Sequence, residues 1–158
     1  MRYKITDLGV NRLPGFVAER AAERPGPFRS AEDVAGFMKD RLVATDREVF
    51  YVLILDSQNR LIAEEPVSVG TLTASLVHPR EVFAPALVRR GAAIIVVHNH
   101  PSGNPEPSEE DRTITTRLLD AGSILGIALL DHVILGGEGR YTSLAADIRM
   151  RKGGSRAS

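Results

Sequence analysis

The sequence predicts an α/β fold in which a mixed β-sheet is flanked by helices. Two observations lead to this prediction. Residues 49–55 and 92–97 form unbroken apolar runs rich in β-branched residues, which is typical of strands buried on both faces. Other segments carry apolar residues at helical spacing, as expected of helices that cover a sheet. A chain of 158 residues is long enough to form one such domain.

The first half of the chain predicts one helix followed by three strands. Ser30 can cap a helix that continues to Leu42, with apolar residues on one face. Short turns then separate the strand at 49–55 from a strand near 60–67, and that strand from a third one near 71–76. Short connections between consecutive strands predict an antiparallel meander.

The second half of the chain alternates helices with strands. It predicts a helix over 80–90, a strand over 92–97 that ends at His98, a helix over 108–125, a strand over 127–135 and a final short helix capped by Ser143. Pro85 lies inside the first of these helices and predicts a kink or a late start.

Composition divides the chain into three parts. Residues 30–148 are expected to form one compact unit. Residues 1–29 contain three prolines and no sustained periodicity, and we expect an N-terminal arm there. Residues 149–158 are basic and contain glycine, which predicts a flexible tail.

Residue counts exclude several classes of site and partner. The chain has no cysteine, so a metal would be held by His, Asp, Glu or water rather than by thiolates. Twenty Lys and Arg balance twenty Asp and Glu, which gives no electrostatic footprint for tight nucleic-acid binding. No apolar run approaches the roughly 20 residues that a membrane helix needs, and residues 1–7 lack an apolar signal-peptide stretch. We therefore expect a cytoplasmic protein with no membrane partner.

The segment from His98 to Asp111 predicts a metal site. His98 and His100 end a predicted strand, and side chains two residues apart on a strand point to the same side. A proline-rich loop then leads to Asp111 in the first turn of the next predicted helix. Two imidazoles and a carboxylate leave one tetrahedral position for water, the pattern of a catalytic zinc site. Zinc lowers the pKa of such a water from about 15.7 to about 7.

Each part of this segment also has a purely structural interpretation. Ser108 and Asp111 form a good helix capping box, and a histidine pair can be an ordinary polar strand end. The capping box, however, explains neither histidine. Buried imidazoles cost desolvation energy unless they are bonded, so the combined pattern favours a metal site over separate structural roles.

A hydrolytic zinc site also needs a base, and Glu48 is the main candidate. It directly precedes the most apolar predicted strand, so it is either a solvated strand end or a carboxylate in a pocket. The residues alone favour the solvated strand end. Weaker candidates lie in predicted turns or on exposed helix faces: Glu64, Glu65, Glu81, Glu106, Glu109 and Glu110.

The spacing of these residues resembles the JAMM signature of MPN/JAB-domain metalloproteins. The signature is carried by His98-x-His100, followed by seven residues, Ser108, two residues and Asp111. The flanking motifs are similar to the bacterial RadC branch over about residues 45–148: Gly70-Thr71-Leu72, His78-Pro79-Arg80-Glu81-Val82-Phe83, His98-Asn99-His100-Pro101-Ser102-Gly103 and Asp131-His132-Val133-Ile134.

The resemblance implies a helix-flanked mixed sheet similar to that of cytidine deaminases. It implies that His98, His100 and Asp111 are zinc ligands, and that Glu48 is the general base. Ser108 matches the serine that polarises the scissile carbonyl and stabilises the oxyanion. The function implied is a zinc metallopeptidase that cleaves amide or isopeptide bonds in a peptide or protein substrate.

Two other functions stay open. The RadC label and the arginines of residues 149–156 favour a DNA-repair-associated nucleic-acid-binding or nuclease accessory protein, whereas the zero net charge and the shortness of residues 1–29 argue against it. The second open function is a partner-binding scaffold without catalysis, which we rank last because all the expected metal ligands are present. A zinc deaminase is disfavoured because its signature requires cysteines.

Asp131 and His132 form a further pair whose role the sequence leaves open. They are either a pair that orients the metal ligands from outside, or a strand-end pair with no part in catalysis. We slightly favour the second interpretation.

Overall fold

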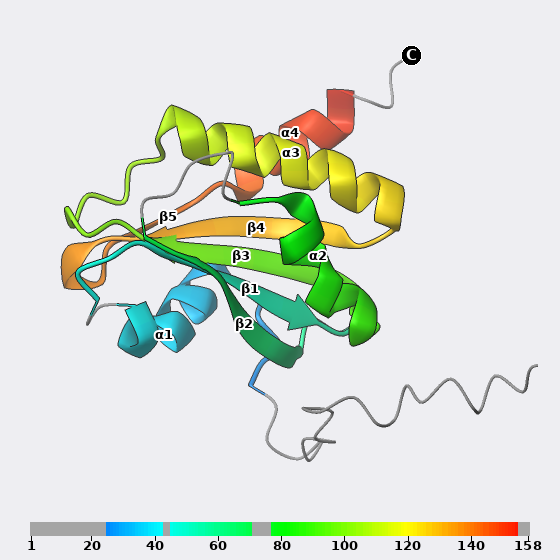
Figure 1. The fold of residues 1–158 in the computed structure, drawn as a ribbon, viewed down its shortest axis with the longest axis horizontal. Coiled ribbons are helices and arrows are strands. Elements are labelled where there is room, and N and C mark those ends of the chain that lie inside the picture. The colour runs from blue at the N-terminus through cyan, green and yellow to red at the C-terminus, as the bar shows by residue number, and fades with distance from the viewer. Residues whose placement is uncertain (1–24, 43–44, 71–76, 155–158) are drawn as a thin grey trace, which may run out of the picture.

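Five strands form one mixed sheet, in the order β2-β1-β3-β4-β5, with helices on both sides (Figure 1). The structure is a computed structural model and describes residues 25–42, 45–70 and 77–154. Its elements are α1 (Ala31–Leu42), β1 (Val49–Leu55), β2 (Leu61–Val69), α2 (Pro79–Val88), β3 (Ala93–Asn99), α3 (Glu109–Leu125), β4 (Ala128–Leu135), a short 3-10 helix (Gly137–Gly139), β5 (Tyr141–Ser143) and α4 (Ala145–Gly154). The predicted α/β fold with a helix-flanked mixed sheet is confirmed.

The pairing of the central strands brings distant segments to one edge of the sheet. β1 is antiparallel to both β2 and β3, and β3 is parallel to β4. Phe50, at the beginning of β1, therefore lies opposite His98, at the end of β3. The parallel neighbour β4 is reached through α3, as a parallel connection requires a crossover. Residues just before β1 and just after β3 thus share one edge.

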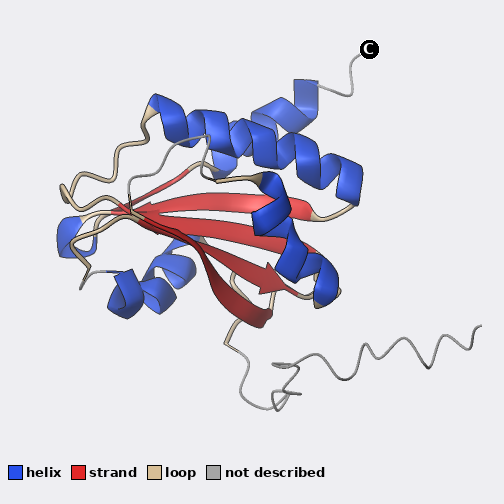
Figure 2. Ribbon diagram, in the orientation of Figure 1, coloured by secondary structure: helices blue, strands red, loops and turns tan. Residues whose placement is uncertain are grey.

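Helices cover both faces of the sheet (Figure 2). One apolar core lies on each face. Side chains of α2, α3 and α4 pack on one face, which we call the α3 face, and side chains of α1 pack on the other, the α1 face. β3 is buried along its whole length because it lies under helices on both sides. This explains why its sequence shows an unbroken apolar run instead of alternation.

Several boundaries differ from the sequence predictions. The expected strand near 71–76 lies outside the described residues, and so do residues 1–24 of the expected arm. Phe28 is buried in the α1-face core, two residues before the predicted start of the compact unit. α4 continues to Gly154, beyond residue 148. The three-residue strand β5 was not predicted, because so short a segment has no measurable periodicity.

The turn before α4 uses the serine expected to cap a helix there. The Ser143 hydroxyl accepts a hydrogen bond from the backbone N–H of Ala145, the first residue of α4, at 3.2 Å. Ser143 itself belongs to β5, so its side chain connects the end of the sheet with the start of the last helix. Within the ranges that the structure describes, no helix combines the length and the apolar character needed to cross a membrane.

Candidate metal centre

Two histidines reach the α3 face from the end of β3. His98 lies opposite Phe50 in the sheet, and its ring stacks on the phenyl ring at a centroid distance of 5.8 Å. The His98 side chain has no exposed surface, whereas 14% of the His100 side chain is exposed. One imidazole is thus enclosed in the protein, and the other lies at the border between protein and solvent.

The start of α3 brings a carboxylate to these rings. Ser108 is the N-cap of α3: its hydroxyl accepts from the backbone N–H of Asp111 at 3.1 Å, and its own N–H donates to Asp111 Oδ2 at 2.8 Å. The capping box therefore fixes the carboxylate, which is buried. Helix capping and metal ligation, weighed as alternatives on the sequence, are compatible because the cap places the candidate ligand.

The loop between His100 and Ser108 is tied to the residues that follow β4. The Gly103 carbonyl accepts hydrogen bonds from the Gly137 N–H at 2.9 Å and from the Arg140 guanidinium at 3.0 Å. A Cβ on Gly136 would lie 2.5 Å from the same Gly103 oxygen, so this close approach requires glycine at position 136. These contacts hold the loop that leads from His100 to Asp111.

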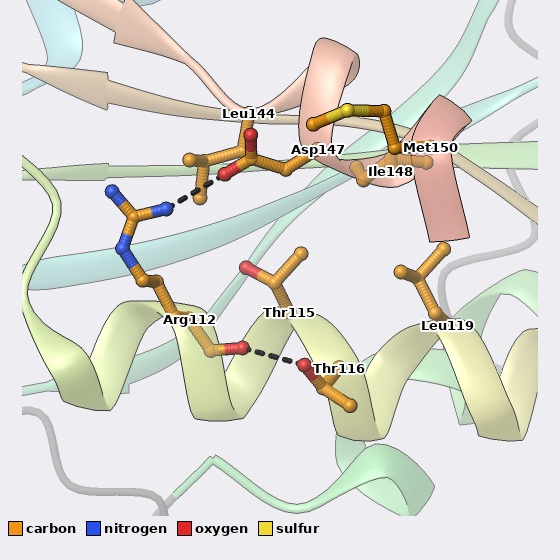
Figure 3. Close-up of a pocket in the computed structure, with 8 residues that line it drawn as sticks. All are labelled: Arg112, Thr115, Thr116, Leu119, Leu144, Asp147, Ile148 and Met150. Carbon is orange, nitrogen blue, oxygen red and sulfur yellow. Dashed lines mark hydrogen bonds and ion pairs between the residues drawn. The ribbon is translucent and has the colours of Figure 1, made fainter. Parts of the chain in front are cut away.

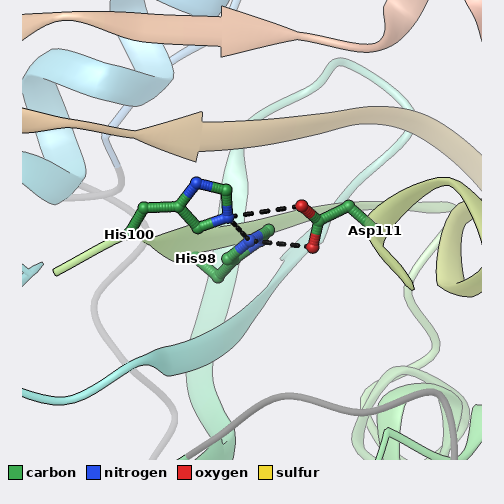
Figure 4. Close-up of side chains that lie close together, drawn as sticks. All are labelled: His98, His100 and Asp111. Atoms are coloured by element: carbon green, nitrogen blue, oxygen red, sulfur yellow. Dashed lines mark hydrogen bonds and ion pairs between the residues drawn. The ribbon is translucent and has the colours of Figure 1, made fainter. Parts of the chain in front are cut away.

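The three side chains converge on one point (Figure 4). One ligand atom from each of His98, His100 and Asp111 lies within 4.8 Å of the others. The two Nε2 atoms are 3.0 Å apart, and the carboxylate oxygens lie 3.1 Å from His98 Nε2 and 3.3 Å from His100 Nε2. Ligands at 2.0–2.1 Å from a tetrahedral zinc are about 3.3 Å apart. The spacing of the donor atoms therefore fits a single ion of this kind.

The hydrogen bond of His100 to the backbone leaves its Nε2 available to bind a metal. Its Nδ1 lies 2.8 Å from the carbonyl oxygen of Asn104. A carbonyl can only accept, so the proton of the neutral ring is on Nδ1 and the lone pair is on Nε2. That lone pair points at the shared centre, which is the arrangement of a metal-binding histidine with its second nitrogen bonded to the protein.

The charges at the centre also favour a cation. Burial alone would raise the pKa of Asp111, but the contacts with His100 and His98 outweigh it and hold that pKa well below its usual range. The hydrogen bond with Asp111 is the main cause of the raised pKa of His100, which burial opposes. Asp111 is therefore ionised at neutral pH, and its negative charge is available to a bound ion.

Glu48 lies at the same edge of the sheet as the three candidate ligands. Glu48 directly precedes β1, whose residue Phe50 pairs with His98, the residue two positions before His100. The bond from the Gly70 N–H to the Glu48 carbonyl, at 2.8 Å, anchors its backbone. The charge of Glu48 contributes to the raised pKa of His100. Its side chain is half-buried, so the solvated strand end that we favoured describes it incompletely.

Asn99 holds the segment that carries Glu48. Its side-chain oxygen accepts from the Val49 N–H at 2.8 Å, and its NH₂ group donates to the Arg47 carbonyl at 2.9 Å. The same NH₂ lies 3.3 Å from the Thr45 hydroxyl. Because Asn99 points to the α1 face, it can anchor this segment without entering the histidine cluster. We did not single out Asn99 from the sequence, although it stands between the two histidines.

The Asp131–His132 pair divides between the two faces. His132 is fully buried and lies next to His98, with His132 Nε2 at 2.9 Å from His98 Nδ1. Burial lowers the pKa of His132 well below its usual value, so its ring is neutral. Asp131 instead accepts a hydrogen bond from the Ser143 hydroxyl at 2.7 Å. The two residues therefore contact different partners on opposite faces of the sheet, and the role of each stays a prediction.

Thr115 is a further member of the cluster that the sequence analysis missed. It lies on α3 four residues after Asp111 and hence on the same side of the helix. Its hydroxyl donates to the Asp111 carbonyl at 2.6 Å and lies 2.7 Å from His132 Nδ1. The signal was the i, i+4 spacing from a candidate ligand, which we did not consider.

The weaker carboxylate candidates lie away from the cluster or on its exposed side. Glu64 and Glu65, on β2, form ion pairs with Arg41 and Arg89. Glu81 pairs with its neighbour Arg80 at the start of α2. The remaining three are exposed, in the loop before α3 or in its first turn: Glu106, Glu109 and Glu110.

A separate hollow lies between α3 and α4 (Figure 3). Its lining includes the apolar side chains of Leu119, Leu144 and Ile148, and an ion pair between Arg112 and Asp147 at 2.7 Å. It contains no histidine, and its one carboxylate is already paired. None of its lining residues is one of the candidate ligands His98, His100 and Asp111, so we take the histidine cluster rather than this hollow as the candidate site.

Comparison with known proteins agrees with this geometry. The model of a family described as RadC-like JAB domain matches residues 28–150. The chain belongs to this family. The resemblance predicted from the sequence motifs is thereby confirmed, and the mixed sheet flanked by helices is consistent with a RadC-like JAB domain.

Curated relatives of this RadC-like JAB domain come from bacteria and archaea. A UPF0758 protein of Desulforudis audaxviator is 49% identical over 132 residues, which are 81% of this chain and 57% of that protein. A UPF0758 protein of Methanosarcina acetivorans is 47% identical over 135 residues, 85% of this chain and 57% of the relative. The chain spans a little over half the length of these relatives.

Proposed function

We propose that this RadC-like JAB domain is a zinc-dependent hydrolase that cleaves amide or isopeptide bonds in peptide or protein substrates. The observation that carries the proposal is the convergence of His98, His100 and Asp111, whose ligand atoms lie within 4.8 Å of one another. Two imidazoles and one carboxylate are a donor set suited to zinc, and three protein ligands leave a position open, as in catalytic sites.

A bound zinc ion would supply Lewis-acid chemistry and acidify water at this position. In the proposed reaction, Glu48 accepts a proton from the attacking water while the water oxygen bonds to the carbonyl carbon of the substrate. The carbon–nitrogen bond then breaks, and Glu48 returns the proton to the leaving amine. Glu48 is half-buried, and its charge contributes to the raised pKa of His100; both observations support this role.

Ser108 is the proposed donor to the oxyanion. Its Oγ accepts from the Asp111 N–H, which leaves the hydroxyl proton for another partner. Ser108 is exposed, so a substrate carbonyl can approach it. A hydroxyl fixed by a helix cap needs little reorganisation when negative charge develops on the substrate oxygen, and such preorganised donors stabilise transition states.

Metal analysis of the purified chain tests the first part of the proposal. We expect about one zinc per chain in the wild type and little zinc in His98→Ala and Asp111→Ala. Cobalt substitution gives a second measurement, since a tetrahedral site with nitrogen and oxygen ligands gives intense visible absorption bands. A wild-type protein without stoichiometric metal after reconstitution would overturn the proposal.

A substrate screen with zinc-loaded protein tests the second part. Peptide and isopeptide libraries are incubated with the wild type and with Glu48→Gln, which keeps the side-chain shape but cannot accept the proton at neutral pH. We expect cleavage by the wild type and at least about a 100-fold lower rate for Glu48→Gln. Equal zinc content in the two proteins is the control. Equal rates would remove Glu48 from the mechanism.

Nucleic-acid binding, the alternative suggested by the RadC resemblance, stays a prediction that the same preparation can test. Binding of single- and double-stranded DNA is measured at increasing salt concentrations. Affinity that falls steeply with salt would favour the accessory role, because neutralised phosphates release counterions. If the protein cleaves peptides and does not bind DNA even at low salt, the nucleic-acid alternative is excluded and the hydrolase proposal is retained.

A further inference from the structure

His132 is enclosed between a candidate metal ligand and α3. It lies on β4, the parallel neighbour of β3, where it is in register with Val96. Its side chain has no exposed surface, and both of its ring nitrogens have partners. Nε2 lies 2.9 Å from His98 Nδ1, and Nδ1 lies 2.7 Å from Thr115 Oγ1. The ring therefore connects α3 with the buried face of His98.

The direction of these hydrogen bonds follows from the backbone carbonyl of Asp111, which can only accept. The Thr115 hydroxyl donates its only proton to the backbone carbonyl of Asp111, at 2.6 Å. Toward His132 it can therefore only accept, so the His132 proton is on Nδ1. A neutral imidazole has one N–H, which leaves His132 Nε2 as an acceptor for the Nδ1–H of His98. The lone pair of His98 is then on Nε2, the atom that points at His100 and Asp111.

We propose that His132 and Thr115 are positioning residues that fix the tautomer and the ring orientation of His98 for metal binding. This inference rests on the proposed function, because it assigns these two residues to the same metal site. For His100, the backbone carbonyl of Asn104 has the equivalent role. Both candidate imidazoles thus have their Nδ1 proton fixed by an acceptor, one from the backbone and one through a side-chain relay.

This chain of hydrogen bonds starts at one candidate metal ligand and ends at another. It begins at His98, passes through His132 and Thr115, and ends on the carbonyl of Asp111, whose carboxylate faces His98 Nε2 at 3.1 Å. A change at Thr115 therefore reaches two of the three ligands. Groups that orient metal-binding histidines in this way usually change metal affinity by about 10- to 100-fold when they are removed.

A matched pair of variants at Thr115 isolates the hydroxyl. Thr115→Val keeps the shape but removes the acceptor, so the His132 ring gains by moving its proton to Nε2. That proton would point at His98 Nδ1 and drive the His98 proton onto the metal-binding nitrogen. Thr115→Ser keeps the hydroxyl and is the control. We expect about a 10- to 100-fold weaker zinc affinity for Thr115→Val and a change within about threefold for Thr115→Ser, measured by competition with a chromophoric chelator.

Position 132 offers a second pair. In His132→Gln the side-chain amide can still accept from His98 and donate to Thr115, whereas His132→Leu can do neither. We expect His132→Gln to retain most of the zinc affinity that His132→Leu loses. Circular dichroism and melting temperature confirm that each variant is folded. If His132 had only a structural role, its variants would differ in melting temperature according to residue size. The zinc affinity of the folded variants would then be unchanged.

Nitrogen-15 NMR of the histidine rings gives a measurement that needs neither metal nor a variant. In the wild-type apoprotein, at mildly alkaline pH, we expect the Nδ1–H tautomer for both His98 and His132. Finding the Nε2–H tautomer on His98, or equal zinc affinities for Thr115→Val and Thr115→Ser, would overturn the inference. If the wild type binds no zinc, the proposed function fails, and the NMR measurement still decides the hydrogen-bond chain by itself.

Discussion

His98 and Asn99 are neighbours on β3, both are buried, and they face opposite sides of the sheet. On the α1 face, Asn99 uses both ends of its amide to bind the segment before β1. On the α3 face, His98 binds one protein partner through Nδ1 and directs Nε2 at two other candidate ligands. The polar atoms of Asn99 bind only the segment before β1, whereas Nε2 of His98 faces the other two candidate metal ligands.

Asp131 and His132 repeat this contrast on β4. Asp131 is in register with Ile95, a residue of the α1-face core, and accepts from the Ser143 hydroxyl and from a backbone N–H. His132 belongs to the histidine cluster. Burial of a polar group is costly unless it is bonded. On the α1 face, Asn99 and Asp131 form hydrogen bonds with nearby structural groups. On the α3 face, His132 contacts His98, whose other ring nitrogen faces the remaining candidate ligands.

The largest effect that separates the two faces is expected on metal binding. His98→Ala removes one of three ligands, and we expect zinc affinity to fall by at least about 100-fold. Asn99→Leu, one residue away, should keep the affinity within about threefold. Isothermal titration calorimetry of both variants checks the comparison. Similar losses in the two would mean that the faces are not functionally distinct.

Removal of zinc should destabilise the α3 face in particular. A ligand at a hundredfold excess over its Kd stabilises the folded state by about 2.7 kcal/mol, so a chelator should lower the melting temperature of the metal-loaded protein. Hydrogen exchange locates the change: amides of the first turn of α3 and the end of β3 should lose protection, whereas those of α1 should not. Uniform loss over both faces would contradict the comparison.

The anchoring role of Asn99 predicts a loss of stability without a loss of metal. In Asn99→Leu the buried N–H of Val49 has no acceptor, which should lower the free energy of unfolding by about 2 kcal/mol. Urea denaturation of the metal-free protein measures it. If Glu48 is the base, the same variant should also cleave substrate more slowly, because the backbone that carries Glu48 is less well held. An unchanged unfolding free energy would refute the anchoring role.

The smallest effect is expected for Ser143→Ala. The variant removes the hydroxyl donor to Asp131 and should cost about 1 kcal/mol at neutral pH. Burial raises the pKa of Asp131 in the folded state, so stability from this group is greatest at low pH and falls as the pH rises through that raised pKa. Without the hydroxyl the fall should be larger. Chemical denaturation at pH values on both sides of this transition measures it, with zinc affinity as the unchanged control.

Sequence patterns were sufficient for the fold class and for the candidate ligands. The apolar runs of β1 and β3 identify buried strands because each is covered on both faces. His98, His100 and Asp111 were found because their spacing is local: a strand period of two, a short loop and a helix start. Local spacing fixes local geometry, and these three side chains need little else to meet.

The partners of the ligands could not be predicted in the same way. Thr115 and His132 meet only because α3 and β4 pack against β3, and that packing depends on the whole sheet. The proximity that lets the charge of Glu48 act on His100 likewise depends on the β1–β3 register, which no periodicity within β1 specifies. The split of Asp131 from His132 follows from strand alternation, which the sequence analysis did not apply to that pair.

The ligands come from one short stretch of chain, whereas the groups that direct them come from elsewhere. A peptide that copies residues 98–111 would contain all three candidate ligands but neither Glu48 nor His132. In such a peptide nothing would fix the tautomers of the two imidazoles, and the proposed base would be missing. Under the proposed function, transplanting this stretch into another scaffold would transfer the candidate ligands without the proposed base and without the groups that orient His98.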